Sequence, residues 1–265
     1  MGWSSVIGRV PFLDCDPFFS APSNAWSSLS TPPSWLSGHL LRKDCLIAPI
    51  PLSDYAANHE YLQLIPDIGI ISEGELGTSF IFGNRSIEKM RDIALPSDSS
   101  SSQFLLRWIL SKRSLSPSFI DTGTHVNNML NQCDGALVIG DRALHEYSIK
   151  SDNIRLNLIN EWNKLTGFPM ILGVFASRKD SPKEKIKIAH SHLKNQINYF
   201  NKDRIYREQI IQHASERINI SFEIIEEYFN NQLSYFLDNR AINSIELFLK
   251  KVCALDLEPE WFSFD

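Results

Sequence analysis

The chain has 265 residues, of which 43% are hydrophobic and 22% are charged, and its formal net charge at pH 7 is −5. This length suffices for one large domain, or two closely packed ones, with a hydrophobic core that is stable without disulfide bonds or a structural metal ion. The net negative charge argues against the excess of basic residues that is typical of proteins that bind nucleic acid or an anionic membrane, so neither is expected as a partner.

The cysteines and histidines give no sign of a metal site. The four cysteines are far apart and form no CxxC pair, which predicts free thiols in a reducing compartment. The seven histidines show no metal-ligand spacing. The N-terminus has no basic start followed by a long apolar run, and the longest apolar stretch, residues 168–176, is too short to span a bilayer. A cytoplasmic location is therefore the expectation.

The first third of the chain predicts short strands alternating with helices. A strand is expected over residues 6–10, followed by a loop over 11–17 and a surface connection rich in Ser, Pro and Trp over 21–33. The elements expected next are a helix over 34–43, a strand over 46–50, a short helix after Pro51, and strands over 62–64, 68–72 and 78–82.

The remainder of the chain is expected to continue this alternation and then to become helical. The expected strands are 93–95, 118–121, 136–139 and 170–176. The expected helices between them contain residues 104–109, 126–132, 142–149 and 157–165. After Arg178 only helices are expected, within 181–197 and over 205–213, 221–230 and 243–252.

Strands that alternate with helices predict an α/β fold with open, mixed sheets. The middle block, residues 83–175, is expected to form an inserted second lobe. Residues 1–82 and 176–265 then form a discontinuous first lobe that carries the C-terminal helices. The chain would cross between the lobes twice, near 82–85 and 173–177, and ligand clefts favour such a hinged interface.

Several segments, in the same order along the chain, carry a resemblance to a known family. They are Ile7-Gly8-Arg9-Val10-Pro11-Phe12-Leu13-Asp14, Pro33-Ser34-Trp35-Leu36, Gly69-Ile70 with Gly74, the serine run before Gln103, Asp134-Gly135-Ala136-Leu137-Val138-Ile139-Gly140-Asp141, and Glu161-Trp162 with Thr166-Gly167. Together they resemble the chorismate dehydratases of the futalosine route to menaquinone. That resemblance covers residues 6–176 and implies the two-lobed fold of type II periplasmic binding proteins, with a ligand cleft between the lobes.

The resemblance implies dehydration of chorismate to 3-[(1-carboxyvinyl)oxy]benzoate without a metal or an organic cofactor. The expected partner is thus a small-molecule dicarboxylate. Loss of the C4 hydroxyl and the C3 proton makes an aromatic ring, and in the family the enolpyruvyl carboxylate of the substrate is thought to assist proton removal. The task left to the protein is to desolvate and orient the substrate and to hold its two carboxylates.

The serine run at residues 99–102 precedes a helix whose first N–H groups need partners. A helix N-terminus suits a carboxylate, and Ser101 and Ser102 match a Thr-Ser pair that contacts the substrate in the family. Simple capping of the helix is the alternative for these hydroxyls. Ser100 stands where many relatives have Arg.

Three further positions are substrate-binding candidates. Gly140 and Asp141 end an expected strand, where side chains can face a cleft. The alternative is that Asp141 caps the following helix and that Gly140 only eases the turn. Thr78 stands where relatives have a Ser in the cleft, and its alternative is that of a β-branched strand residue.

Asp14 is the catalytic candidate, at a position where the family commonly has Asn. An amide can donate a hydrogen bond, whereas an ionised carboxylate only accepts. Beside a dianionic substrate, Asp14 would have to be protonated, paired with Arg9, or used as an acid or base. The alternative is a turn residue without a chemical role.

Two other functions remain as alternatives to chorismate dehydration. One is the sister enzyme of the same fold that forms 1,4-dihydroxy-6-naphthoate, which depends on a histidine in the cleft; His125 or His145 would have to serve. The other is a catalytically inactive or divergent protein that binds a small carboxylate.

Overall fold

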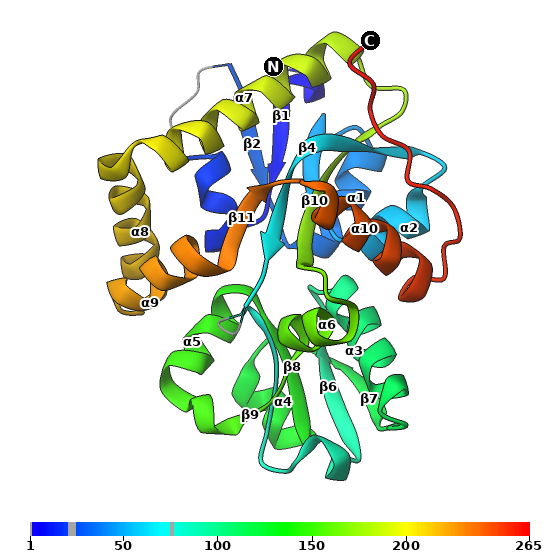
Figure 1. Ribbon diagram of the computed structural model, residues 1–265, viewed down its shortest axis with the longest axis vertical. Helices are drawn as coiled ribbons and strands as arrows, with labels where there is room; N and C mark the ends of the chain where they lie inside the picture. Colours follow the sequence, from blue (N-terminus) through cyan, green and yellow to red (C-terminus); the bar gives the residue numbers. More distant parts are fainter. Residues whose placement is uncertain (1, 21–24, 75–76) are drawn as a thin grey trace.

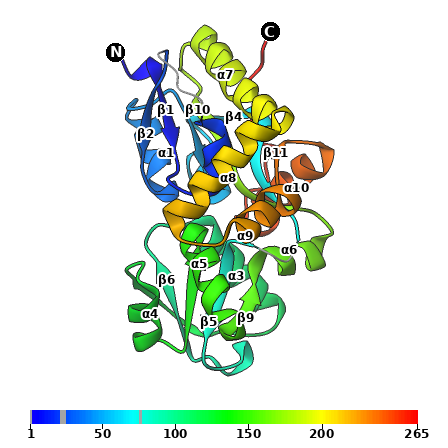
Figure 2. The same ribbon diagram turned by 90° about the vertical axis from the view of Figure 1, so that its left-hand side faces the viewer.

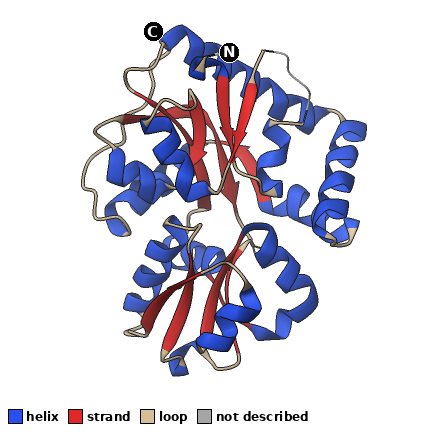
Figure 3. Ribbon diagram, turned by 180° about the vertical axis from the view of Figure 1, so that it is seen from behind, coloured by secondary structure: helices blue, strands red, loops and turns tan. Residues whose placement is uncertain are grey.

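The computed structural model describes residues 2–20, 25–74 and 77–265. They form two lobes stacked end to end, with both ends of the chain in the larger lobe, far from the junction (Figure 1). Each lobe is built on one sheet that carries helices on both faces (Figure 3). None of the helices in these ranges is long and apolar enough to cross a membrane.

The sheet of the larger lobe has the strand order β11-β4-β10-β3-β1-β2. Its strands are β1 (Val6–Arg9), β2 (Ser27–Ser30), β3 (Ile47–Ile50), β4 (Leu62–Ser72), β10 (Met170–Arg178) and β11 (Leu233–Phe236). β1 is parallel to β2 and β3, whereas β10 is antiparallel to β3 and β4. The sheet is therefore mixed, and β3 is buried along its whole length, as expected for an apolar strand covered on both faces.

The helices of the larger lobe come from both ends of the chain. They are α1 (Pro33–Leu41), α2 (Leu52–Asn58), α7 (Lys183–Lys202), α8 (Arg204–Ile218), α9 (Phe222–Glu227) and α10 (Asn239–Lys251), with the 3-10 segments η1 (Trp3–Ser5) and η2 (Leu13–Phe18) and the π-helical segment η5 (Tyr228–Gln232). α8 runs down the side of the larger lobe toward α5 of the smaller lobe (Figure 2). This course brings the end of α8 to the junction of the lobes.

The sheet of the smaller lobe has the order β7-β6-β8-β5-β9. Its strands are β5 (Ser79–Gly83), β6 (Asp92–Pro96), β7 (Ser118–Thr122), β8 (Gly135–Ile139) and β9 (Ile154–Asn157). Its helices are α3 (Ser101–Lys112), α4 (Val126–Gln132), α5 (Gly140–Lys150) and α6 (Leu158–Thr166), with the 3-10 segments η3 (Ile87–Lys89) and η4 (Ser151–Asn153). Local signals explain the bounds of α6, because the Asn157 side chain accepts the N–H groups of Ile159 and Asn160 and Gly167 adopts φ 77° at the end.

Two segments join the lobes: one leads from β4 into β5, and the other returns from α6 into β10. The lobe boundaries expected from the sequence, 82/83 and 175/176, fall inside β5 and β10. The division of the chain at those positions stays a prediction.

Near the N-terminus the structure is more regular than the sequence suggested. The expected loop over 11–17 contains η2, in which every residue is buried. Part of the expected surface connection over 21–33 is the edge strand β2, parallel to β1; residues 21–24 lie outside the described residues. A polar edge strand such as β2 is stabilised by hydrogen bonds to its neighbour, which its own sequence does not reveal.

Three strands differ from expectation because their pairing partners are distant in sequence. The two strands expected over 62–64 and 68–72 are one long strand, β4, in which Asp67 has φ 69°. β9 was not expected, and it pairs with β5. β10 is not the last strand, since β11 pairs with β4, so the prediction of helices alone after Arg178 was wrong.

Candidate functional site

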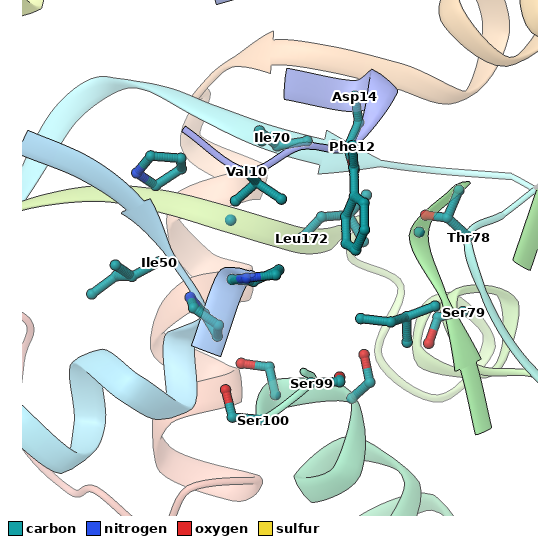
Figure 4. A pocket seen from close by; sticks show the side chains of 18 residues that line it. Val10, Phe12, Asp14, Ile50, Ile70, Thr78, Ser79, Ser99, Ser100 and Leu172 are labelled. Atoms are coloured by element: carbon teal, nitrogen blue, oxygen red, sulfur yellow. The ribbon is translucent and has the colours of Figure 1, made fainter. Parts of the chain in front are cut away.

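A cavity lies between the lobes. Its lining comprises Val10, Phe12, Asp14, Pro33, Pro49, Ile50, Pro51, Ile70, Thr78, Ser79, Ser99, Ser100, Ser101, Ser102, Ile139, Gly140, Leu172 and Gly173. In Figure 4, Asp14 lies on the side opposite Ser99 and Ser100, while Val10, Ile50 and Ile70 are apolar side chains of the surrounding wall. Most of the lining is apolar, so a bound ligand would be largely removed from water.

The cavity brings together five of the six site residues expected from the sequence. Asp14, Thr78, Ser101, Ser102 and Gly140 all line it, although they come from separate segments of both lobes. The sixth, Asp141, does not line the cavity.

Asp14 lies in η2 and is only 7% exposed. The pKa of its carboxyl is raised to about 8, chiefly by burial and in addition by the negative charges of Asp141 and Asp16, although the Cys15 backbone N–H and Arg217 act to lower it. At pH 7 the carboxyl is therefore mostly protonated and can donate a hydrogen bond. A neutral acid at this position avoids repulsion of an anionic ligand.

The cations near Asp14 bind its neighbour Asp16 instead. A guanidinium nitrogen of Arg9 lies 2.7 Å from Asp16 Oδ1, and one of Arg217 lies 2.8 Å from Asp16 Oδ2. The pairing of Asp14 with Arg9, one of the states considered from the sequence, is absent from the interactions of the described residues. The two arginines thus form ion pairs with Asp16 and not with Asp14.

Asp141 joins the lobes and is not part of the cavity lining. Its Oδ1 accepts the Leu13 backbone N–H at 2.9 Å, and its Oδ2 lies 3.6 Å from Arg217. It makes no capping bond at the start of α5, and it faces a second hollow that also contains His125 and His145. Burial raises the pKa of Asp141 to about 6, while the Leu13 N–H and Arg217 lower it.

Position 140 requires glycine, both because of its backbone conformation and because of the side chain packed against it. It has φ 62°, and a Cβ at this position would lie 2.6 Å from the Phe12 ring of the other lobe. Its N–H donates to the Thr78 carbonyl at 2.9 Å. Gly140 therefore allows the close approach of the two lobes at the cavity.

The N-terminus of α3 carries the serine run. The helix begins at Ser101, and Ser100 at its N-cap makes no side-chain capping bond. Ser101 Oγ accepts the Ser53 backbone N–H at 3.0 Å and lies 3.1 Å from Ser53 Oγ. Because Ser53 belongs to α2 of the larger lobe, the Ser101 hydroxyl connects the lobes across the cavity wall.

One residue of the site carries no signal in the sequence. Tyr228, in the π-helical segment η5, is fully buried, and its hydroxyl oxygen lies 3.1 Å from Thr78 Oγ1. The pair is separated by 150 residues, so only the fold reveals it. π-helical turns are frequent at functional sites, but the sequence pattern here predicts an ordinary helix.

Within the described ranges, no group of three or more His, Cys, Asp or Glu side chains is arranged to hold a metal ion. The chemical groups at the cavity are instead a carboxyl, several hydroxyls and the N-terminus of α3. This set can bind an oxyanion and exchange a proton with it.

The fold and the cavity define the class of two-lobed proteins with a periplasmic-binding-protein-like fold. A Candida albicans protein that defines a family with the generic periplasmic binding protein fold has a TM-score of 0.66 and 12% identity, and the match covers 94% of this chain and 89% of that one. The periplasmic aliphatic sulphonate binding protein of Escherichia coli has a TM-score of 0.63 and 13% identity, with coverage of 96% and 94%.

Sequence comparison gives a narrower assignment. The profile of the menaquinone biosynthesis family matches residues 5–254, and the chain belongs to this family. A chorismate dehydratase of Thermus thermophilus is 23% identical over an alignment of 168 residues, and the match covers 58% of this chain. The match spans 62% of that relative.

Proposed function

We propose that this protein is a lyase that dehydrates chorismate to 3-[(1-carboxyvinyl)oxy]benzoate in menaquinone biosynthesis. The observation that carries the proposal is the buried Asp14 carboxyl, whose pKa of about 8 keeps it neutral beside a mostly apolar cavity. The family assignment and the similarity to a chorismate dehydratase support the same reaction.

The proposed reaction uses Asp14 as the general acid. Its proton passes to the departing C4 hydroxyl, the C4–O bond breaks, and water leaves. The C3 proton passes to a carboxylate of the substrate and then to Asp14, so the carboxyl ends in its starting state. Formation of the aromatic ring makes the step strongly downhill, and the protein contributes orientation and proton transfer.

The opposite wall is proposed to hold a carboxylate of the substrate. The N-terminus of α3 carries partial positive charge and free backbone N–H groups, and Ser99 to Ser102 line the cavity there. Ser102, together with Thr78 and Gly140, is assigned to substrate contact. Ser101 is assigned a shared role, because its hydroxyl is also bonded to Ser53. Asp141 is assigned to closing the lobes around the substrate, and a cytoplasmic location is proposed for the reaction.

The alternative sister enzyme requires a histidine in the cleft. Among the described residues that line the cavity there is no histidine, and His125 and His145 lie at the second hollow. This arrangement favours chorismate dehydration over formation of 1,4-dihydroxy-6-naphthoate.

The deciding experiment incubates purified protein with chorismate and identifies the product by mass spectrometry and ultraviolet absorption. We expect 3-[(1-carboxyvinyl)oxy]benzoate from the native protein and loss of turnover in Asp14→Ala. A native protein that binds chorismate by calorimetry but does not convert it is a divergent binding protein. Absence of both binding and turnover refutes the proposed function.

A further inference from the structure

Tyr228 does not line the cavity, yet it contacts a residue that does. Its hydroxyl lies 3.1 Å from Oγ1 of Thr78, and Thr78 is part of the cavity wall. Both side chains are buried, Tyr228 completely and Thr78 with 5% exposed. The two hydroxyls therefore share one hydrogen bond away from bulk water, and its direction decides what Thr78 offers to a ligand.

The surroundings of Tyr228 fix that direction. Burial and the nearby Asp14 raise the pKa of the Tyr228 hydroxyl well above its ordinary value, so it keeps its proton. Among the described residues, Thr78 is the side chain to which this hydroxyl is hydrogen-bonded. If Thr78 were the donor, the phenolic proton would be buried without an acceptor, which is costly. The 3.1 Å contact by itself allows either hydroxyl to donate, so this cost is the ground for assigning Tyr228 as the donor and Thr78 Oγ1 as the acceptor.

The hydroxyl proton of Thr78 is then directed away from Tyr228. The backbone carbonyl of Thr78 already accepts the Gly140 N–H at 2.9 Å, and Figure 4 shows the Thr78 hydroxyl on the side that faces the cavity. A hydroxyl whose oxygen accepts one bond donates along another staggered direction. Thr78 thus presents an oriented O–H donor to the ligand.

We propose that Tyr228 is a positioning residue for substrate binding, which orients the Thr78 hydroxyl as a donor to a carboxylate oxygen of the ligand. The inference deepens the proposed function and rests on it, because the carboxylate is that of chorismate. It adds to the site a residue that lies outside the cavity and acts through the lining.

Tyr235 provides a matched control within the same lobe. It is 3% exposed, and burial together with the charge of Asp14 raises the pKa of its hydroxyl, as for Tyr228. In contrast to Tyr228, its hydroxyl has no hydrogen-bond partner among the described residues. Tyr235→Phe therefore removes the same atom from a similar environment without disturbing Thr78.

The test is a double-mutant cycle on chorismate affinity, measured by calorimetry. Thr78→Val removes the donor and should raise Kd about tenfold, as expected for a lost hydrogen bond to a charged group. Tyr228→Phe leaves the donor free among three staggered orientations and should raise Kd about threefold. The double variant should match Thr78→Val alone, since Tyr228 acts through Thr78. Tyr235→Phe should leave Kd unchanged.

Steady-state kinetics distinguish positioning from a general loss of structure. Tyr228→Phe should raise KM and leave kcat within about twofold, because it weakens a contact made before and during the reaction. Thr78→Ser keeps the hydroxyl and should retain the native affinity. Effects of Tyr228→Phe and Thr78→Val that multiply in the double variant would overturn the inference, as would an equal loss in Tyr235→Phe.

Failure of the proposed function gives a different result. In that case the native protein neither binds nor converts chorismate, and the same cycle is measured on the free energy of unfolding. Coupling between Tyr228→Phe and Thr78→Val then supports the oriented hydroxyl pair, whereas independent effects overturn it.

Discussion

The two polar walls of the cavity differ in the kind of group that they bury. The η2 wall, residues 13–18 of the larger lobe, holds Asp14 within a cluster of ionisable side chains that includes Asp16. The α3 wall, residues 99–102 of the smaller lobe, carries only hydroxyls and backbone N–H groups. The first wall therefore changes its charge with pH, whereas the second offers fixed dipoles. Under the proposed function, the first wall would serve proton transfer and the second would bind a carboxylate of the substrate.

The walls also differ in how they hold the lobes together. At the η2 wall, Arg217 and the Leu13 N–H both reach Asp141 of the smaller lobe. At the α3 wall, the contact is the pair of bonds between Ser101 and Ser53. Closure of the cavity thus depends on a charged contact at one side and a neutral contact at the other.

The largest expected effect is that of Asp14→Asn on stability. The pKa of Asp14 rises from 3.8 to about 8 on folding. Between these values the unfolded chain has lost its proton and the folded protein has kept it, so the native protein loses stability as the pH rises toward 8. Asp14→Asn should be more stable than the native protein by roughly 5 kcal/mol at pH 9, with little difference at pH 4. Denaturant unfolding at both pH values measures this difference.

The same variant separates an enzyme from an inactive relative. Turnover by the native protein should fall as the pH rises through 8, where Asp14 loses its proton. Asp14→Asn keeps a hydrogen-bond donor but cannot transfer the proton, so turnover should fall, and any turnover that remains should not change as the pH passes through 8. An inert native protein whose Asp14→Asn variant converts chorismate would identify the chain as a diverged binder.

The next effect concerns the contact of the two lobes at Gly140. Alanine there would place a Cβ at φ 62° and 2.6 Å from the Phe12 ring. Left-handed backbone strain and the clash together should lower the free energy of unfolding by about 2–4 kcal/mol and abolish tight binding of chorismate. Gly123→Ala is the control, because nothing lies within 4 Å of a Cβ at that position. Equal stability of the two variants would contradict the assignment of Gly140 to lobe contact.

Ser101→Ala tests the neutral contact of the α3 wall. It removes two bonds and leaves the Ser53 N–H without its partner, which should cost about 1–3 kcal/mol of stability. Ser102→Ala should change stability by less than about 0.5 kcal/mol and act mainly on chorismate affinity. Thermal unfolding and calorimetry of both variants distinguish the two roles. An equal loss of stability in Ser102→Ala and Ser101→Ala would contradict the assignment of lobe contact to Ser101 and ligand contact to Ser102.

The smallest effect is a shift of the pH profile in two opposite directions. Asp141 raises the pKa of Asp14, and Arg217 lowers it. Asp141→Asn should therefore move the alkaline loss of activity to lower pH, and Arg217→Gln should move it to higher pH. Profiles of kcat/KM from pH 6 to 9.5 measure both midpoints. A common direction of shift would show that the variants act through the lobe contact rather than through charge.

Apolar periodicity and turn residues act locally, so the α/β class and most of the helices and strands could be predicted from the sequence. α4 has the bounds expected from the sequence, Val126–Gln132. The ordered segments that resemble the dehydratases also predicted the fold and named Asp14, Thr78 and Gly140, which line the cavity. Local patterns could not reveal β2, β9 or β11, since each is stabilised by pairing with a strand elsewhere in the chain.

The chemical state of the site could not be predicted from local sequence, because it depends on contacts that form on folding. The pKa of Asp14 depends on burial within the folded lobe and on the charges of Asp141 and Arg217, which are distant in sequence. Tyr228 reaches Thr78 in the same way, across 150 residues. Desolvation and Coulomb interactions act through space between residues that are distant in sequence. The protonation of these groups and the direction of their hydrogen bonds therefore depend on the fold.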